Sequence, residues 1–147
     1  MANRREKVDY SPRHPNAPIR GQVARGVIPP GIKVDRSGQD ALVFSSMLSG
    51  HDDESPGHEL PAEPERELEI LFRHIRGFVE AAGGSANDLT NVTFFAMDDA
   101  HRATILKEWG KLFPDTKRQP PYHVLNVAPS GLRGERVEAV VVARIRR

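Results

Sequence analysis

The chain has 147 residues, a length that fits one domain with its own hydrophobic core. It contains no cysteine, so disulfides and thiolate metal sites are excluded. With 21 basic and 20 acidic residues its formal net charge is +1, which gives no general attraction to nucleic acid or to a membrane surface. The sequence shows neither an apolar run long enough to span a membrane nor the apolar region of a signal peptide. We therefore expect a soluble cytoplasmic protein.

The N-terminal part of the chain carries several prolines and charges and no hydrophobic period. We interpret residues 1–22 as a flexible arm and residues 23–147 as the folded domain. The domain begins with a weak strand over residues 31–35 and a clearer, β-prone strand over residues 41–46. A polar stretch over residues 49–64, rich in Gly, Pro, Asp and Glu, then predicts a loop.

Two helices are predicted because apolar residues recur with the helical period. The first runs over residues 64–82, with a proline suited to its first turn and the pair Gly83-Gly84 to end it. The second follows Asp98 or Asp99, since a short carboxylate can accept hydrogen bonds from the free N–H groups of a first turn. It extends to about Phe113, where Pro114 prevents its continuation.

Three further strands are predicted over residues 91–97, 122–127 and 136–145, which gives the order β-β-α-β-α-β-β. The last is so apolar between Val137 and Ala143 that we expect it to be buried on both faces. Two helices can cover only one face of a sheet of five or six strands. The other face needs a partner, and a symmetric assembly packed through its sheets would supply one.

Five short segments, taken in order over roughly residues 25–145, resemble one family. They are Leu42-Val-Phe-Ser-Ser-Met47, Gly57-His-Glu-Leu-Pro61, Phe78-Val-Glu-Ala-Ala-Gly-Gly-Ser85, Leu112-Phe-Pro-Asp115 with Pro120-Pro121, and Arg136-Val-Glu-Ala-Val140. Their order and spacing are similar to those of the RidA (YjgF) family. The resemblance implies a chorismate-mutase-like α+β fold, with a mixed sheet of about six strands and two helices on one face. It also implies a homotrimer with a central barrel-like core, whose inter-subunit clefts hydrolyse reactive enamines and imines without a cofactor or metal.

The position that carries the family's best-known chemistry differs in this chain. The family places an arginine at the start of the strand after the second helix, where its guanidinium holds the substrate carboxylate. Tyr122 stands there, after Pro120 and Pro121. A phenol supplies no fixed positive charge, and one charge-assisted pair contributes about 1.5–3 kcal/mol. Tyr122 is interpreted as a cleft wall or hydrogen-bond donor, or more simply as an ordinary strand aromatic. Arg118 lies four residues upstream and would have to swing in to reach the cleft.

Glu138 matches the family glutamate that positions a water molecule. A carboxylate in an otherwise apolar strand is costly unless it is paired or hydrated. Its presence suits a group that moves protons in a cleft. The alternative is a sheet-edge salt bridge with Arg136 or Arg144. Glu138 and Tyr122 are therefore the predicted catalytic residues.

Four further positions are predicted to line the cleft. The family's Ser-Gly-Gln reads Ser45-Ser46-Met47 here, so Ser46 adds a hydroxyl where glycine would let the backbone approach a ligand. Ile32 replaces a tyrosine common in the family, and the backbone N–H near Val124 can still stabilise developing negative charge. This cleft keeps its acid and lacks its cation, so we expect a ligand less anionic than a 2-imino acid.

Other groups of polar residues are weaker candidates. His51-Asp-Asp-Glu54 and His58 include types that bind metals, but a loop rich in Gly and Pro fixes no geometry, and a solvated loop is the simpler interpretation. His74 is expected to be a packing residue at the border of the first helix's apolar stripe. We thus expect a deaminase that acts on a reactive imine or enamine. The alternative is a non-catalytic trimer that binds a small metabolite or a regulatory partner.

Overall fold

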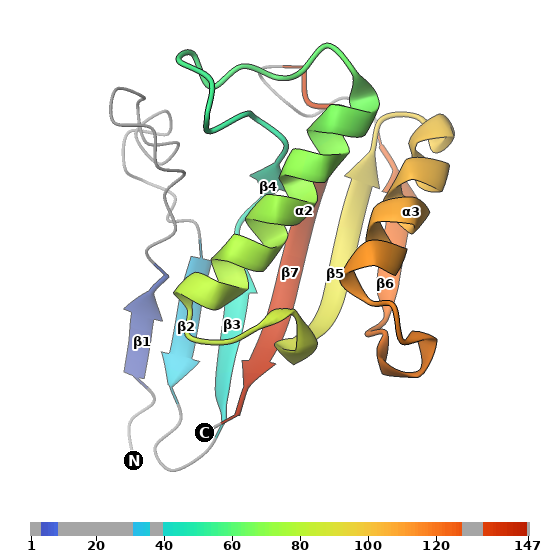
Figure 1. The fold of residues 1–147 in the computed structure, drawn as a ribbon. Helices are drawn as coiled ribbons and strands as arrows, with labels where there is room; N and C mark the ends of the chain where they lie inside the picture. The colour runs from blue at the N-terminus through green and yellow to red at the C-terminus, as the bar shows by residue number, and fades with distance from the viewer. Residues whose placement is uncertain (1–3, 9–30, 36–39, 128–133, 147) are drawn as a thin grey trace.

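The computed structural model describes residues 4–8, 31–35, 40–127 and 134–146. They form one mixed sheet with strand order β1-β2-β3-β7-β5-β6, and helices α2 and α3 lie on one of its faces (Figure 1). The strands are β1 (Arg4–Lys7), β2 (Gly31–Asp35), β3 (Ala41–Ser45), β4 (Leu48–Ser49), β5 (Leu89–Ala96), β6 (Tyr122–Asn126) and β7 (Val137–Ile145). The helices are α2 (Pro64–Ala81) and α3 (Arg102–Leu112), with short 3-10 turns η1 (Ala86–Asp88), η2 (Asp99–His101) and η3 (Thr116–Arg118). The predicted α+β fold with two helices on one face is confirmed.

The ends of the two helices follow the predicted signals. Pro64 occupies the first turn of α2, where its missing N–H costs no hydrogen bond. At the other end Gly83 has φ +93° and Gly84 donates to the carbonyl of Val79, so the orphan carbonyls of the last turn are satisfied. The Asp98 carboxylate accepts from the N–H of Ala100 and caps the short turn η2 that leads into α3.

Strand β7 lies in the middle of the sheet and pairs antiparallel with β3, β4 and β5. Its residues alternate between the two faces, as a pleated strand requires. Every second residue is buried under the helices: Val137, Ala139, Val141, Ala143 and Ile145. The residues between them, on the face without helices, are half-buried or exposed. The expectation of burial on both faces is therefore not met within a single chain, because none of its described elements covers the second face.

The core between the helices and the sheet is centred on an aromatic cluster. Trp109 of α3 contacts Phe113 at a ring-centroid distance of 4.7 Å and Phe94 of β5 at 6.1 Å. Phe72 of α2 stacks on Phe94 at 5.5 Å. These contacts join both helices to β5, so the covered face of the sheet is held as one packed layer.

The N-terminal segment differs in part from the prediction. Arg4–Lys7, which fall within the predicted flexible arm, form strand β1 and pair antiparallel with β2. Val8, which follows, is buried. The expectation is wrong for these residues, since the backbone of β2 would otherwise present an open edge. Residues 1–3 and 9–22 lie outside the described residues. Among the residues described, none of the helices combines the length and apolar character needed to cross a membrane.

Candidate functional site

The predicted cleft residues Ser46 and Met47 lie at a break between β3 and β4. Phe44 pairs with Val142 and Leu48 with Ala139, so β3 and β4 advance four residues while β7 advances three. The extra residue makes a β-bulge, and the Ser45 hydroxyl accepts a hydrogen bond of 2.8 Å from the N–H of Val141 within it. A bulge changes the direction of its side chains, and that of Met47 is 40% exposed.

Glu138 lies on the face of the sheet without helices, the open face. It stands opposite Phe95 of β5 and Ser49 of β4 in the register. The neighbouring strand residues on this face are largely apolar and include Leu42, Phe44, Phe95, Leu125, Val140 and Val142. Among the strand side chains that the structure describes on the open face, Glu138 is the one carboxylate. The predicted acid is thus half-buried in an apolar surface.

The arginines that could have paired with Glu138 have carboxylate partners of their own. The Arg136 guanidinium contacts Glu67 at 2.6 Å, and the Nε of Arg144 contacts Asp40 at 2.6 Å. The salt bridges of Arg136 and Arg144 are thus made with Glu67 and Asp40, whereas the predicted alternative paired one of these arginines with Glu138.

Tyr122 lies on the opposite, helix-covered face. It pairs with Val92 at the start of β6, and its ring packs on Trp109 at a centroid distance of 4.7 Å and edge-to-face on Phe94 at 6.3 Å. The side chain is half-buried, and among the described residues no hydrogen bond reaches its hydroxyl group. The packing favours the simpler interpretation of Tyr122 as a strand aromatic, with its hydroxyl at the border of the core.

The backbone of Val124 has the geometry expected of a hydrogen-bond donor. Strand β6 is an edge of the sheet and pairs parallel with β5 alone. The N–H of Val92 donates to the carbonyl of Pro121, and the N–H of Val127 donates to the carbonyl of Ala96. These are the first and last hydrogen bonds between β5 and β6. Parallel strands bond through every second residue, which turns the N–H of Val124 away from β5. The side chain of Val124 packs against the core on the covered face.

A single chain does not bring the predicted site residues together. Tyr122 and Glu138 lie on opposite faces and on strands separated by β5. Ile32 occupies the β2 position opposite Phe44, next to the bulge that contains Ser46 and Met47. The bulge lies beside β7, the strand that carries Glu138, whereas Tyr122 is on the strand at the far edge. A cleft containing all of them would need residues from a second copy of the chain.

Arg136 fastens the start of β7 to the start of α2. Its guanidinium contacts the Glu67 carboxylate and donates to the carbonyls of Pro61 and Ala62, and its N–H donates to Glu67. Glu67 is only 1% exposed, so this is a buried charge that depends on its partner. Because Glu138 follows two residues later, the clamp also fixes the strand from which it projects.

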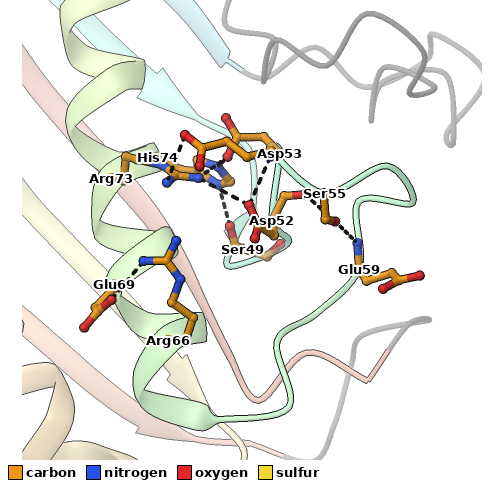
Figure 2. Close-up of polar contacts among 10 residues, drawn as sticks. Ser49, Asp52, Asp53, Ser55, Glu59, Arg66, Glu69, Arg73 and His74 are labelled. Carbon is orange, nitrogen blue, oxygen red and sulfur yellow. Dashed lines mark hydrogen bonds and ion pairs between the residues drawn. The ribbon is translucent and has the colours of Figure 1, made fainter.

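A second polar cluster fastens the loop before α2 (Figure 2). The Nδ1 of His74 lies 2.7 Å from the carbonyl oxygen of Ser49, and its Nε2 lies 3.2 Å from the Asp53 carboxylate, which also contacts Arg73. Both ring partners, a carbonyl and a carboxylate, are acceptors, and an imidazole satisfies both at once only when both of its nitrogens carry hydrogen. Burial raises the pKa of Asp53, but the hydrogen bond and charge of His74 and the charge of Arg73 outweigh it and hold that pKa below 3.8.

His51 repeats this arrangement at the other side of the loop. Its Nδ1 lies 2.7 Å from the carbonyl oxygen of His58, and its Nε2 lies 2.8 Å from the Glu135 carboxylate. His51, His58 and His74 are all buried. The expectation of a solvated loop is wrong at these residues, because the loop is folded back and hydrogen-bonded to α2 and to the segment before β7. No group of three potential metal ligands occurs among the described residues.

Comparison with known proteins addresses the family. No family model and no curated protein matches the sequence. Among solved structures, RidA from the Antarctic bacterium Psychrobacter sp. PAMC 21119 is similar, with a TM-score of 0.71 and 25% identity over 90% of this chain and 97% of that one. The YyfA protein of the conserved Rid family from Yersinia pestis superimposes with a TM-score of 0.74 at 17% identity, over 97% of this chain and all of that one.

A Mycobacterium tuberculosis member of the YjgF/YER057c/UK114 family has the same fold, with a TM-score of 0.70 at 15% identity over 97% of this chain and 100% of that one. The fold is that of solved RidA (YjgF) proteins. The agreement in fold extends over nearly the whole chain, and the short motifs resemble those of that family in the same order. By the resemblance of the motifs, Glu138 falls at the position of that family's glutamate and Tyr122 at the position of its arginine.

Proposed function

We propose that the protein is a homotrimer that hydrolyses a reactive imine or enamine in clefts between its subunits, with Glu138 directing the attacking water. The observation that carries this proposal is the position of Glu138, a half-buried carboxylate on an apolar sheet face. A surface of this kind is normally covered by a partner. Covering it would also exclude bulk water from the carboxylate and leave room for a bound water molecule beside it.

The reaction needs a general base that moves protons and a hydrogen-bond donor that stabilises developing negative charge. Glu138 takes a proton from water as the water oxygen bonds to the carbon of the C=N group, and that proton passes to the nitrogen to give a carbinolamine. Glu138 then takes the carbinolamine hydroxyl proton and passes it to the nitrogen as well. The C–N bond breaks as the C=O bond forms, so an imine and water give a carbonyl compound and ammonia. An outward-facing N–H such as that of Val124 would donate to charge developing on the substrate. An enamine enters the same route after protonation of its carbon to the imine.

The substrate should be less anionic than a 2-imino acid. The side chain at the arginine position, Tyr122, is packed on Trp109 and carries no positive charge. A neutral or aromatic imine loses nothing there, whereas a 2-imino acid loses a contact of about 1.5–3 kcal/mol, or about tenfold to a hundredfold in affinity.

Ammonia release tests this proposal. The protein is supplied with the enamine formed by serine dehydration and, separately, with neutral and aromatic imines. We expect turnover of the neutral or aromatic imines, and loss of at least about a hundredfold in kcat with Glu138→Gln, because general-base catalysis contributes about 10²–10⁴-fold. Glu80→Gln, which changes an exposed carboxylate of α2, is the matched control and should retain the activity.

A second candidate function is supported by the same geometry. Tyr122 is held in the aromatic core on the face away from Glu138, which favours a trimer that binds a small metabolite without converting it. No turnover of any imine by an intact trimer, as sized by sedimentation velocity, would favour that binder. Turnover that Glu138→Gln leaves unchanged would remove Glu138 from the mechanism, and a monomer at micromolar concentration would remove the shared cleft.

A further inference from the structure

Three arginines converge at the end of the sheet farthest from Glu138. Arg118 of η3, Arg144 of β7 and Arg146, which follows β7, line one hollow of about 600 Å³ together with Thr90 and Asp88. The lining residues come from the start of β5, the end of β7 and η3. These two strand ends lie at the lower end of the sheet in Figure 1. Three guanidinium groups and one carboxylate line the hollow, and two of the arginines also contact aspartates outside the lining, Arg144 with Asp40 and Arg118 with Asp115.

The two polar side chains that line the hollow beside the arginines make local hydrogen bonds. The Asp88 carboxylate accepts from the N–H of Ser85 at 2.8 Å and completes the capping box of η1. The Thr90 hydroxyl donates to the carbonyl of Val142 at 3.1 Å. Both of these Asp88 and Thr90 contacts are local, and Asp88, whose other carboxylate oxygen stays available, offsets one of the three positive charges.

Two of the arginines contact an aspartate through the Nε atom of the guanidinium group only. Arg144 bonds to Asp40 through Nε at 2.6 Å, and Arg118 contacts Asp115 through Nε at 3.6 Å. Within the described part of the chain, the terminal Nη groups of both make no hydrogen bond, and Arg146 makes no ion pair. A guanidinium fixed at Nε presents its Nη groups in a planar arrangement that matches the oxygens of carboxylate or phosphate.

We propose that this hollow binds a small anion that carries a carboxylate or phosphate group. Arg144 and Arg146 grip its oxygens from the end of β7, and Arg118 closes on it from η3. Residues 138 and 144 are six positions apart on one strand, about 20 Å at 3.3 Å per residue. The anion site is therefore distinct from the cleft proposed around Glu138, and its existence does not depend on hydrolysis there.

Calorimetric titration of the full-length protein with inorganic phosphate, and separately with malonate, tests this site. The buffer is kept at low ionic strength because exposed charges are screened over about 8 Å at physiological salt. We expect one saturable site per chain for at least one probe, and the preferred probe identifies which oxyanion is recognised. Arg146→Gln and Arg118→Gln should each weaken binding at least about tenfold, since each removes a charge-assisted contact.

Arg102→Gln provides the matched control. Arg102, like Arg118, is exposed and contacts an aspartate three residues earlier through Nε, but it lies at the opposite end of α3. Binding should be unchanged in this variant. A second measurement requires no variant. In ¹H–¹⁵N spectra of the unmodified protein, the added anion should shift the amide signals of Leu89 and Thr90, which line the hollow. No saturable binding of either probe, equal weakening by Arg102→Gln, or shifts elsewhere would overturn the proposal.

Discussion

The two faces of β7 have different roles in the same nine residues. On the covered face Val141 is fully buried among the aromatic core residues. On the open face Val140 stands beside Glu138, half-buried and without a covering element in its own chain. Because pleating assigns successive residues to opposite faces, one strand can hold the fold together with one set of side chains and meet a partner with the other. Substitution of adjacent residues in this strand should therefore separate folding from assembly.

Val141→Asp and Val140→Asp form the sharpest test of this difference, with the largest expected effect. An unpaired carboxylate at Val141 would lie in the closed core, so we expect a loss of more than about 4 kcal/mol in the free energy of unfolding. The same substitution at Val140 should leave a folded chain that no longer assembles, because its carboxylate can stay in water. Thermal unfolding by circular dichroism measures the first effect and sedimentation velocity the second. Equal destabilisation by both, or an unchanged oligomer in Val140→Asp, would contradict the assignment of the faces.

Most of the fold could be predicted because its signals are local. The apolar stripe of α2, the cap at Asp98 and the stop at Gly83 depend only on residues a few positions apart. Strand β1 could not be found in this way, since Arg4–Lys7 are polar and are strand only because they pair with β2. Oligomeric covering of β7 was predicted from composition, but which of its residues form the open face depends on the register.

The polar contacts behind the candidate site were harder to predict. Glu67 and His74 fall in line with Leu71 and Phe78 at helical spacing, so their position in the apolar stripe was a usable signal of burial. Their partners were not predictable, because Arg136 and Asp53 approach from the far end of the chain and from a loop. In the same way, the motifs located Tyr122 and Glu138 in the sequence, but only the strand register places them on opposite faces.

Glu67→Gln examines the covered face at its most buried charge, and we expect the second-largest effect. Removal of one partner leaves the Arg136 guanidinium without its counter-charge, at a cost of about 3 kcal/mol in the free energy of unfolding. Glu69→Gln is the control two residues along the same helix: its pair with Arg66 is exposed, and such pairs contribute about 0–0.5 kcal/mol. The midpoints of urea unfolding measure both variants. A similar shift for the two would show that Glu67 is not buried with Arg136.

Asp53→Asn examines the border of the covered face and should have the smallest effect, one that depends on pH. The variant loses the charge that faces His74 and Arg73, and we expect a decrease of about 1.5 kcal/mol in the free energy of unfolding at pH 7. Since the pKa of Asp53 in the folded chain lies below 3.8, its contribution is complete above that pH and disappears as the pH falls through the folded pKa. Urea midpoints of the two proteins should therefore converge in strong acid. Asp52→Asn, which leaves His74 untouched, should show no such convergence, because Asp52 contacts Arg73 only at 3.7 Å and its hydrogen bond from the N–H of Glu54 can be accepted equally by an asparagine. A difference that persists unchanged into strong acid would mean that Asp53 acts through packing of its side chain, and that charge does not hold the loop to α2.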